Sequence, residues 1–584
     1  MPGSRKLLLA GAACFAAILL AICGGVPGAA AAASASPATK ACGALPGFDS
    51  HAAARLMAGK LTIAPFKAVT VDPHRDGDID WSLNPFRNPT WQQDFRSAGW
   101  VEQLVAGWAA GGPRAKAYQR RAGKIAKGWL KATGPGGRDP QTLVCLVLAF
   151  PGQGWIEGQI PPTVGYYAAH WLGPWNHGLV QDIKLLRIGC GYRASAFGGA
   201  ALSWRKTAVS QMTSMFGPSR LGPAIDAQGA VNEQATGYEN FVYDLWRKAL
   251  PMLRACGYTL PSRITARIAK LPAFLAYATQ PDGNLVQIGD TYVEHPAADP
   301  KEKSPVAVYP DGGYVFGRSA WSRAASFYSL RFGRGRQVHG HDDHMGLTYF
   351  ARGRDLIVNA GHTGYEVSAY RTWLRSPEAA SELVMRRVPF SGAAATRLVA
   401  DRIGRTVQFY EFYDAAFGGH PRYRSVFIDA RPGFAVVLDR AAGAPSYQQL
   451  WHLDPSLKVT TLARSHAIAL APATRTAPAT KLELIQVRLP GQAIPRGSTQ
   501  VVRAHAGPYQ GWVSRQMLQR TPDDVVEMTR TGRSAAILTV IAAVVPGTAV
   551  WATASGPRAG PYRLRVRIGN SSTTLRVTAT GAIG

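Results

Sequence analysis

The sequence predicts a chain of two structural parts, a helical part followed by a part built from antiparallel β-strands. The chain has 584 residues, more than one hydrophobic core usually serves, and 46% of them are hydrophobic, so several cores can form. Apolar residues recur at helical spacing in the first half, and short strand-like runs follow one another in the second half. These observations place the chain in a multidomain class, α then β.

The first 33 residues are typical of an export signal. Arg5 and Lys6 precede an apolar run from Leu7 to Ile22, and a tract of small residues follows. Glycines and a proline interrupt the run before it is long enough to cross a membrane comfortably. We therefore predict a signal peptide over 1–33 and a secreted, periplasmic or cell-envelope protein with no transmembrane segment in the mature chain.

Residues 34–300 form the predicted helical domain. Apolar positions at helical spacing occur in stretches such as Trp100–Trp108 and Ile125–Leu130, and Gly/Pro turns such as 134–137 separate them. This pattern is typical of stacked helical hairpins.

Residues 301–584 form the predicted β-domain. From Tyr309 onward, short runs rich in Val, Tyr, Phe and Thr are separated by Gly, Asp or Pro, as in YVFGRSAW, SFYSLRFG, LTYFARG and YRLRVRIG. So many consecutive strand signals predict a large antiparallel β-sandwich.

The chain is strongly basic. Lys and Arg number 65 against 36 Asp and Glu, a formal charge of +29, which becomes about +27 when Arg5 and Lys6 leave with the signal. An exported protein with this excess is expected to meet acidic polysaccharides or anionic surfaces rather than nucleic acid. A compositional bias alone would give the same total, and the sequence makes no prediction of oligomeric state.

Four cysteines remain after cleavage of the signal. Cys42, Cys145, Cys190 and Cys256 permit one or two disulfides in an oxidising compartment, with three ways to pair all four. A buried free thiol is the alternative at each position, and their spacing lacks the Cys-x-x-Cys pattern of zinc sites.

The segment QVHGHDDHMGL holds three histidines and two aspartates in six positions. Taken alone, His339, His341, Asp343 and His344 match the ligand string of the metallo-β-lactamases, in which imidazoles and a carboxylate hold a zinc pair. In that superfamily a strand ending in an Asp-x-Gly-like turn precedes the motif, whereas here the comparable LIVNAG follows it. Strand-like runs also flank the segment on both sides, so this interpretation is the weaker one.

The same flanks resemble the heparinase II/III-like polysaccharide lyases. GGYVFGRSAW and HGHDDHMGLTYFARGRDLIVNAGHTGY match that family's Gly-Tyr…Arg-Ser…Trp strand, its His-x-His-x-Asp segment and the strand pair that follows. Upstream, WNHGLVQD resembles its Asn-His segment and DAQGAVNEQATGY its Asp-Gly…Glu…Tyr segment, and PDGNLVQIGD and WHLDP also fit. The resemblance spans roughly residues 70–460, with the motifs in the family's order.

This resemblance implies an N-terminal incomplete (α/α) toroid followed by an antiparallel β-sandwich. It also implies cleavage of uronate-containing polysaccharides by β-elimination, in which a proton leaves C5, charge develops on the carboxylate and the C4 oxygen departs. Such a site must neutralise the carboxylate, place a base near C5 and supply an acid to the leaving oxygen.

The family pattern assigns the candidate catalytic residues. Asn176, with His177 beside it, matches the position that neutralises the substrate carboxylate, although an Asn there is also typical of a helix N-cap. Tyr238 matches the tyrosine that protonates the departing oxygen and, as phenolate, accepts the C5 proton; a packed core tyrosine is the alternative. His339 matches the base or charge stabiliser.

Further residues are predicted to contact the substrate or orient the site, and solvated loop or surface positions are the alternative for them. Guanidinium groups suit carboxylates and sulfates. The set comprises Glu233, Arg334, Arg336, His341 and Asp343.

Some relatives bind a structural zinc through three residues, and this chain matches one of them. His341 is present, but Asn359 and Ala380 stand where the family has Asp and His. An amide oxygen is a poor zinc ligand and alanine offers none, so we predict that this zinc site is lost and that no cofactor is needed.

The sequence thus predicts an exported lyase that cleaves an acidic, uronate-bearing glycan. Two alternatives stay open: a non-catalytic protein that binds acidic glycans on the same fold, and the metallo-hydrolase. A heparan-like, hyaluronan-like, alginate-like or bacterial exopolysaccharide would each satisfy the prediction.

Overall fold

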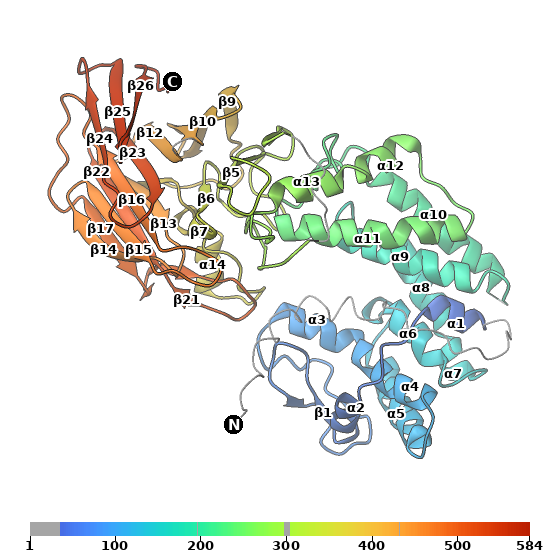
Figure 1. The fold of residues 1–584 in the computed structure, drawn as a ribbon. Helices are drawn as coiled ribbons and strands as arrows, with labels where there is room; N and C mark the ends of the chain where they lie inside the picture. The colour runs from blue at the N-terminus through green and yellow to red at the C-terminus, as the bar shows by residue number, and fades with distance from the viewer. Residues whose placement is uncertain (1–35, 196, 297–303, 431–432) are drawn as a thin grey trace. The chain divides into compact units, whose positions relative to one another are not determined.

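The structure is a computed structural model that describes residues 36–195, 197–296, 304–430 and 433–584 (Figure 1). The predicted signal peptide, residues 1–33, lies outside the described residues. The described chain divides into two compact units. The first holds the residues up to 224 together with 244–265 and 365–367, and the second holds 225–243, 266–364 and 368–584.

The first unit is helical, which confirms the expectation for this half of the chain. Side chains of Asp49, Asn88 and Asp139 cap three of its helices by accepting backbone N–H groups, as residues of these types do. Its helices are α1 (Pro37–Cys42), α2 (Ser50–Met57), α3 (Pro89–Ser97), α4 (Glu102–Ala109), α5 (Ala115–Ala132), α6 (Pro140–Val147), α7 (Gly154–Glu157), α8 (Ile160–Ala169), α9 (Asn176–Gly191) and α10 (Gly198–Ser214). A short pair of strands, β1 (Lys60–Leu61) and β2 (Val69–Thr70), lies between α2 and α3.

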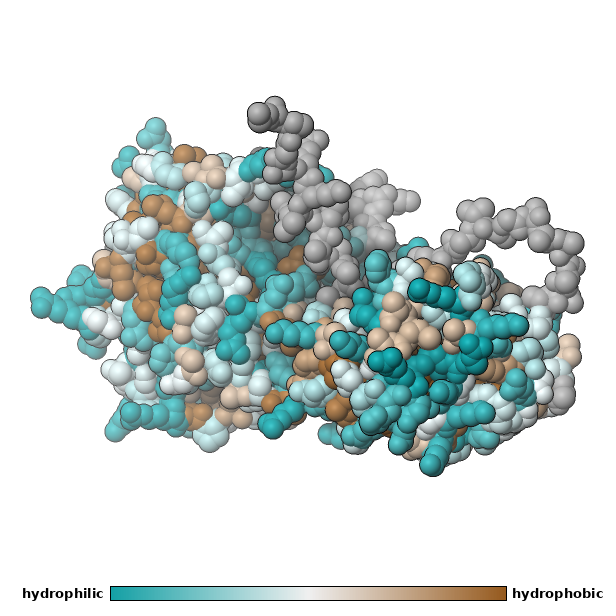
Figure 2. Space-filling view, turned by 90° about the horizontal axis from the view of Figure 1, so that it is seen from below, coloured by the Kyte–Doolittle hydropathy of each residue, from teal (hydrophilic) through white to brown (hydrophobic). Residues whose placement is uncertain are grey.

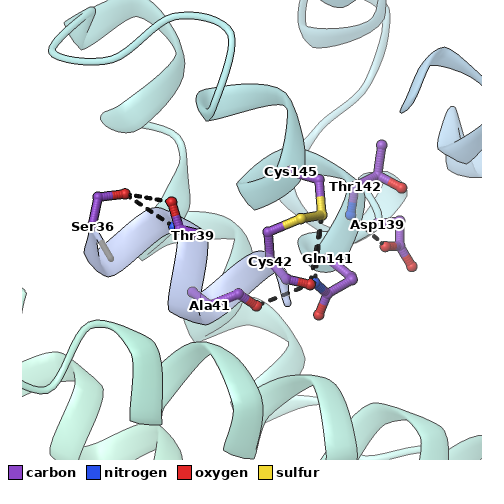
Figure 3. Close-up of a disulfide and its surroundings, with 8 residues drawn as sticks. All are labelled: Ser36, Thr39, Ala41, Cys42, Asp139, Gln141, Thr142 and Cys145. Atoms are coloured by element: carbon purple, nitrogen blue, oxygen red, sulfur yellow. Dashed lines mark hydrogen bonds between the residues drawn. A yellow bond between two sulfur atoms is a disulfide. The ribbon is translucent and has the colours of Figure 1, made fainter. Parts of the chain in front are cut away.

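Two disulfides join helices of the first unit. Cys42 at the end of α1 pairs with Cys145 in α6, a sequence separation of 103 residues (Figure 3). Beside this bond, the Gln141 side chain donates to the backbone carbonyls of Ala41 and Cys42. Cys190 and Cys256 form the second bond. Of the pairings that the sequence left open, the structure therefore has 42–145 with 190–256.

The helices α11 (Thr236–Ala255) and α12 (Ser262–Ile268) run through both units, and α13 (Leu271–Ala278) belongs to the second. The sequence predicted that all three belong to the helical domain. The second unit includes α13 because Phe274 and Leu275 pack in one core with aromatic residues of the five-stranded sheet described below. The expected domain boundary at residue 300 stays a prediction.

The strands of the second unit are antiparallel and fall into several sheets. A five-stranded sheet runs in chain order through β3 (Val306–Tyr309), β4 (Tyr314–Arg318), β5 (Phe327–Arg331), β6 (Leu347–Ala351) and β7 (Arg354–Ile357). A four-stranded sheet has the order β17 (Thr499–Arg503), β22 (Asp524–Thr531), β13 (Ser446–His452) and β8 (Leu383–Arg386). The short helix α14 (Ala369–Leu374) lies between β7 and β8 in the chain.

The largest sheet has eight strands, and a three-stranded sheet follows it in the chain. The eight-stranded order is β14 (Lys458–Ala463), β15 (His466–Ala471), β16 (Thr480–Val487), β23 (Ser534–Val544), β12 (Phe434–Ala442), β11 (His420–Asp429), β10 (Val407–Phe417) and β9 (Arg397–Ile403). The three-stranded order is β24 (Val550–Ser555), β25 (Tyr562–Ile568) and β26 (Ser571–Val577). Two small ribbons complete the unit, β18 (His505–Ala506) with β19 (Tyr509–Gln510), and β20 (Trp512–Val513) with β21 (Thr521–Pro522).

The layering of the second unit explains why some of its strands bury apolar side chains on both faces. In β4, Tyr314 and Phe316 face the α13 core, whereas Val315 faces the core shared with the four- and eight-stranded sheets. In β12, Val437 faces that shared core, and Val436 faces the core that the three-stranded sheet covers. Since side chains alternate along a strand, a strand between two layers must be apolar on both faces.

Hydrophilic side chains cover much of the face of the molecule that Figure 2 shows. Within the described residues, no helix has both the length and the apolar character that crossing a bilayer requires.

Candidate active site

The segment with three histidines lies in the connection between β5 and β6. Its backbone is fixed at His339, whose N–H donates to the Glu233 carbonyl at 3.1 Å and whose carbonyl accepts from the Asp290 N–H at 2.9 Å. Val338 just before it has a φ of 33°, a costly conformation for a β-branched residue. The segments around Glu233 and Asp290 therefore hold His339 in a strained and fixed position.

The first group of the site consists of Tyr238, His339 and Glu233, all in the second unit. The Tyr238 and His339 rings stack face to face, with centroids 3.5 Å apart and planes 5° from parallel. His339 Nδ1 lies 2.8 Å from Glu233 Oε2, and both side chains are buried. Because an ionised carboxylate only accepts hydrogen bonds, Nδ1 is the donor, and Nε2 of the neutral ring carries the lone pair.

This arrangement orients an imidazole against a phenol. A carboxylate behind Nδ1 fixes the tautomer and the ring orientation, as it does for the histidine of a catalytic triad. Tyr238 lies in the first turn of α11, two residues after the helix begins, so the packing of α11 sets the position of the phenol. The group can accept a proton on one ring and donate one from the other.

The second group of the site surrounds Asp290. Its Oδ1 lies 2.8 Å from His341 Nε2, 3.2 Å from His362 Nδ1 and 2.6 Å from Arg371 Nη2. Burial alone would raise the pKa of Asp290, but its three partners hold that pKa well below the usual range. Burial lowers the pKa of His341 to about 4 and also lowers the pKa of His362. At neutral pH this group is therefore an Asp–Arg ion pair flanked by two neutral imidazoles.

The zinc ligands implied by the sequence resemblance do not fit this structure. Ala380 is buried and offers no ligand atom, and the Asn359 Nδ2 lies 3.5 Å from the Gln287 carbonyl. The ligand atoms of Asp290, His341 and His362 do converge, within 4.8 Å of one another. However, Arg371 donates to the same Asp290 oxygen, and its Nη1 lies 3.3 Å from His341 Nε2. A guanidinium thus contacts two of these three residues, Asp290 and His341, at the atoms that a metal ion would use.

Asp343 and His344 have side-chain partners outside both groups. Arg331 Nε lies 3.5 Å from Asp343 Oδ1, and both side chains are buried. His344 Nδ1 lies 3.1 Å from the Thr396 hydroxyl, and burial lowers the pKa of His344 to about 3. The four residues of the metallo-β-lactamase string therefore have four different sets of partners and do not converge on one ion. The contacts of Asp343 support a role in holding the loop, and its role in substrate binding stays a prediction.

The two arginines before the histidine segment are exposed. Arg336 forms an ion pair with Asp342, and the Arg334 carbonyl accepts from the Gln234 side chain at 3.2 Å. Gln234 also accepts from the Gln337 N–H at 2.7 Å, so it ties this loop to the segment that carries Glu233. The contact of Arg334 and Arg336 with the substrate stays a prediction.

Asn176 and His177 belong to the first unit. Asn176 is buried and is the first residue of α9, while Trp175 holds the N-cap position. The His177 ring stacks on Trp175, with centroids 4.3 Å apart and planes 8° from parallel. The role of these two residues in neutralising the substrate carboxylate stays a prediction.

Arg371 and Gln234 were not predicted from the sequence, and Asp290 was quoted only as the last residue of a motif. Asp290 and Arg371 are 81 positions apart, and no local pattern joins them. The Gly-Asp ending of PDGNLVQIGD was the one available signal, because Gly289 has a φ of 63° and the Gln234 and His339 carbonyls leave no room for a side chain there.

Comparison with known proteins finds a family match over part of the chain and a similar fold over most of it. Residues 301–537 match the family model "Heparinase II/III-like, C-terminal". The fold is similar to the crystal structure of heparinase III, with a TM-score of 0.75, 14% identity and coverage of 91% of each chain. It is also similar to a mutant of heparan sulfate lyase HepC from Pedobacter heparinus, with a TM-score of 0.66, 14% identity and coverage of 94% of this chain and 92% of that one. No curated protein matched the sequence. These likenesses confirm the predicted (α/α) toroid and β-sandwich class.

Proposed function

We propose that the chain is a polysaccharide lyase that cleaves an acidic, uronate-containing glycan of the glycosaminoglycan type by β-elimination. The match of residues 301–537 to the heparinase II/III-like C-terminal model supports this proposal. The observation that carries this proposal is the stacked Tyr238–His339 pair with Glu233 behind the imidazole. It supplies the two proton-transfer groups that an elimination needs.

The proposed step moves one proton off the sugar and one onto it. A base removes the C5 proton, the electron pair of that bond forms the C4–C5 double bond, and the C4–oxygen bond breaks. The departing oxygen then takes a proton from an acid. No water and no redox partner enters this balance, and general acid–base assistance of this kind typically contributes 10²–10⁴-fold, or roughly 3–5 kcal/mol.

We assign Tyr238 as the group that protonates the leaving oxygen, and, as phenolate, as an acceptor of the C5 proton. His339 is assigned as the base or charge stabiliser facing it, because Glu233 fixes its orientation and stabilises its imidazolium form. Asn176 is assigned to the substrate carboxylate, where an amide N–H would stabilise the developing negative charge.

The proposed reaction proceeds without a bound metal. The support is Arg371, which pairs with Asp290 and contacts His341 and so already supplies a positive charge to that ligand set. This group would hold the His339–His341 loop in place rather than touch the substrate.

We further propose that the protein is exported. The two disulfides of the first unit are of the kind that persists in oxidising compartments, and acidic polysaccharides are found there too. The exposed Arg334 and Arg336 suit the carboxylates or sulfates of such a polymer.

The test is the ultraviolet absorbance of unsaturated uronate on a panel of heparan sulfate, hyaluronan and alginate, with and without a chelator. Wild type should produce a chelator-resistant rise on at least one glycan, and Tyr238→Phe should reduce it about a hundredfold or more. The control Tyr243→Phe, in the same helix, removes a hydroxyl from a ring that packs against the α13 core and should leave the rate unchanged.

Binding without absorbance would contradict the proposal. If wild type holds one of these glycans in a salt-sensitive manner but never produces the chromophore, the fold serves recognition alone. If the chelator abolishes the rise, the proton-transfer roles need a metal and the assignment of Arg371 is wrong.

A further inference from the structure

The three-stranded sheet β24–β26 presents a basic outer face. Residues 550–577 contain five arginines and no Asp, Glu or Lys. One face of this sheet is apolar, with Leu564, Val566, Leu575 and Val577 in the core shared with the eight-stranded sheet. Side chains alternate along a strand, so Arg563, Arg565 and Arg567 all point to the opposite, exposed face.

Strand register arranges this outer face into three rows. Arg563 lies between Ser555 and Arg576, and Arg565 lies between Thr553 and Thr574. In the third row, Arg567 lies between Trp551 and Ser572. Each row therefore has a guanidinium on the central strand, and successive rows are about 7 Å apart, twice the rise of one strand residue.

The protein bears an electrostatic cost for this arrangement. Arg563 and Arg576 are direct cross-strand neighbours, and like charges in such pairs destabilise a sheet. Among the described residues, no carboxylate forms an ion pair with any of the four row arginines, at positions 563, 565, 567 and 576. A positive surface that forms no ion pair with the described carboxylates suits a negative partner.

We propose that this basic face binds an acidic polysaccharide chain along β25, as a holding surface outside the catalytic groups. The guanidinium groups would pair with carboxylates or sulfates, the flanking hydroxyls would bind sugar hydroxyls, and the exposed Trp551 ring would pack on a sugar face. The family match ends at residue 537, before this sheet begins, so the surface is a feature of this chain beyond the matched domain. The choice of partner rests on the proposed function.

The test uses the full-length protein and measures its affinity for long heparan sulfate, hyaluronan and alginate at several salt concentrations. The variant Arg563→Gln/Arg565→Gln/Arg567→Gln should bind its best glycan about tenfold more weakly, with a flatter dependence on salt. The control Arg114→Gln/Lys116→Gln/Arg120→Gln removes the same charge from exposed positions at the start of α5 and should bind like wild type.

Two further measurements separate this proposal from the proposed function. Initial rates on a tetrasaccharide of the same glycan should not change in the sheet variant, whereas KM on the long polymer should rise. Tyr238→Phe should do the converse, losing product and keeping affinity. Trp551→Ala should weaken binding without changing the salt dependence, because it removes a ring and no charge.

The proposal is overturned if the sheet variant binds long glycan as well as wild type does. Equal losses in the sheet variant and its charge-matched control would also overturn it, since net charge alone would then explain binding. The same conclusion follows if the sheet variant loses affinity only for phosphatidylglycerol vesicles, which would make the face a membrane contact.

Discussion

Two histidines of one loop, His339 and His341, each lie beside a buried carboxylate. The two carboxylate–histidine pairs differ in the third side chain that contacts them. His339 stacks on Tyr238, a group that can donate a proton. His341 shares its carboxylate with Arg371, a group that keeps its proton, and burial lowers the pKa of His341 to about 4. The neighbour of a carboxylate–histidine pair, rather than the pair itself, therefore indicates whether the pair exchanges protons or holds a loop.

Replacing the two histidines in turn tests this difference with the largest expected effect. His339→Gln should reduce the rate of unsaturated product formation by about a thousandfold, because a proton-transfer group is lost. His341→Gln should cost only about tenfold, as the loss of a supporting contact does. The rate on the best glycan of the panel measures both, and equal losses would show that the two pairs do the same work.

The second prediction concerns stability at the Asp290 group. Asp290→Asn should lower the free energy of unfolding by about 3–5 kcal/mol, because it leaves the buried Arg371 charge without its carboxylate. Asp244→Asn, which breaks a partly exposed pair with Arg247, should cost less than about 1 kcal/mol. Urea unfolding of the three proteins gives both values, and a small loss at Asp290 would mean that Arg371 finds other partners.

The third prediction uses His344, which belongs to neither pair. Its pKa is about 3 in the folded protein, against an ordinary value of 6.5, because burial disfavours the charged ring. The unfolded chain therefore binds the proton first as pH falls, and His344 should remove about 2 kcal/mol of stability between about pH 7 and about pH 5. In His344→Gln the loss of unfolding free energy between these two pH values should be smaller by that amount than in wild type. An equal loss in both proteins would contradict the burial argument.

The smallest expected effect on rate is that of a chelator, which should leave the rate of wild type unchanged.

The variant Arg371→Ala should gain one Co²⁺ site per chain, because the ligand atoms of Asp290, His341 and His362 already converge. The visible absorbance of bound Co²⁺ measures this gain. Adding His341→Ala to this variant should abolish the gain. If wild type bound one metal ion per chain, the ion would have displaced the Arg371 guanidinium, which would contradict this prediction.

Much of the fold could be predicted from the sequence because its patterns are local. Alternation in runs such as YVFGR predicted a strand, and the structure has β4 there with alternate residues in two cores. The order of motifs predicted the match to the heparinase II/III-like model, and the candidates Glu233, Tyr238 and His339 came from that resemblance. Their stacked geometry did not, since ring contacts depend on segments about 100 residues apart.

The remaining features depend on contacts that no local pattern encodes. The pairing of Cys42 with Cys145 joins residues 103 positions apart, and spacing alone allowed two other complete pairings. Arg371 carried no signal in YRTWLR, because any exposed helix could contain such an arginine. Its role became visible only when folding placed it against Asp290 and His341.

The most direct test of elimination at the Tyr238–His339 pair is the mass of the products formed from the best glycan. Elimination predicts that each cleavage yields one unsaturated end, so that this product is lighter by one water than the corresponding hydrolysis product. Products with saturated ends only, whose masses include one added water per cleavage, would show hydrolysis and would contradict the assignment of Tyr238 and His339 as the proton-transfer groups of a lyase.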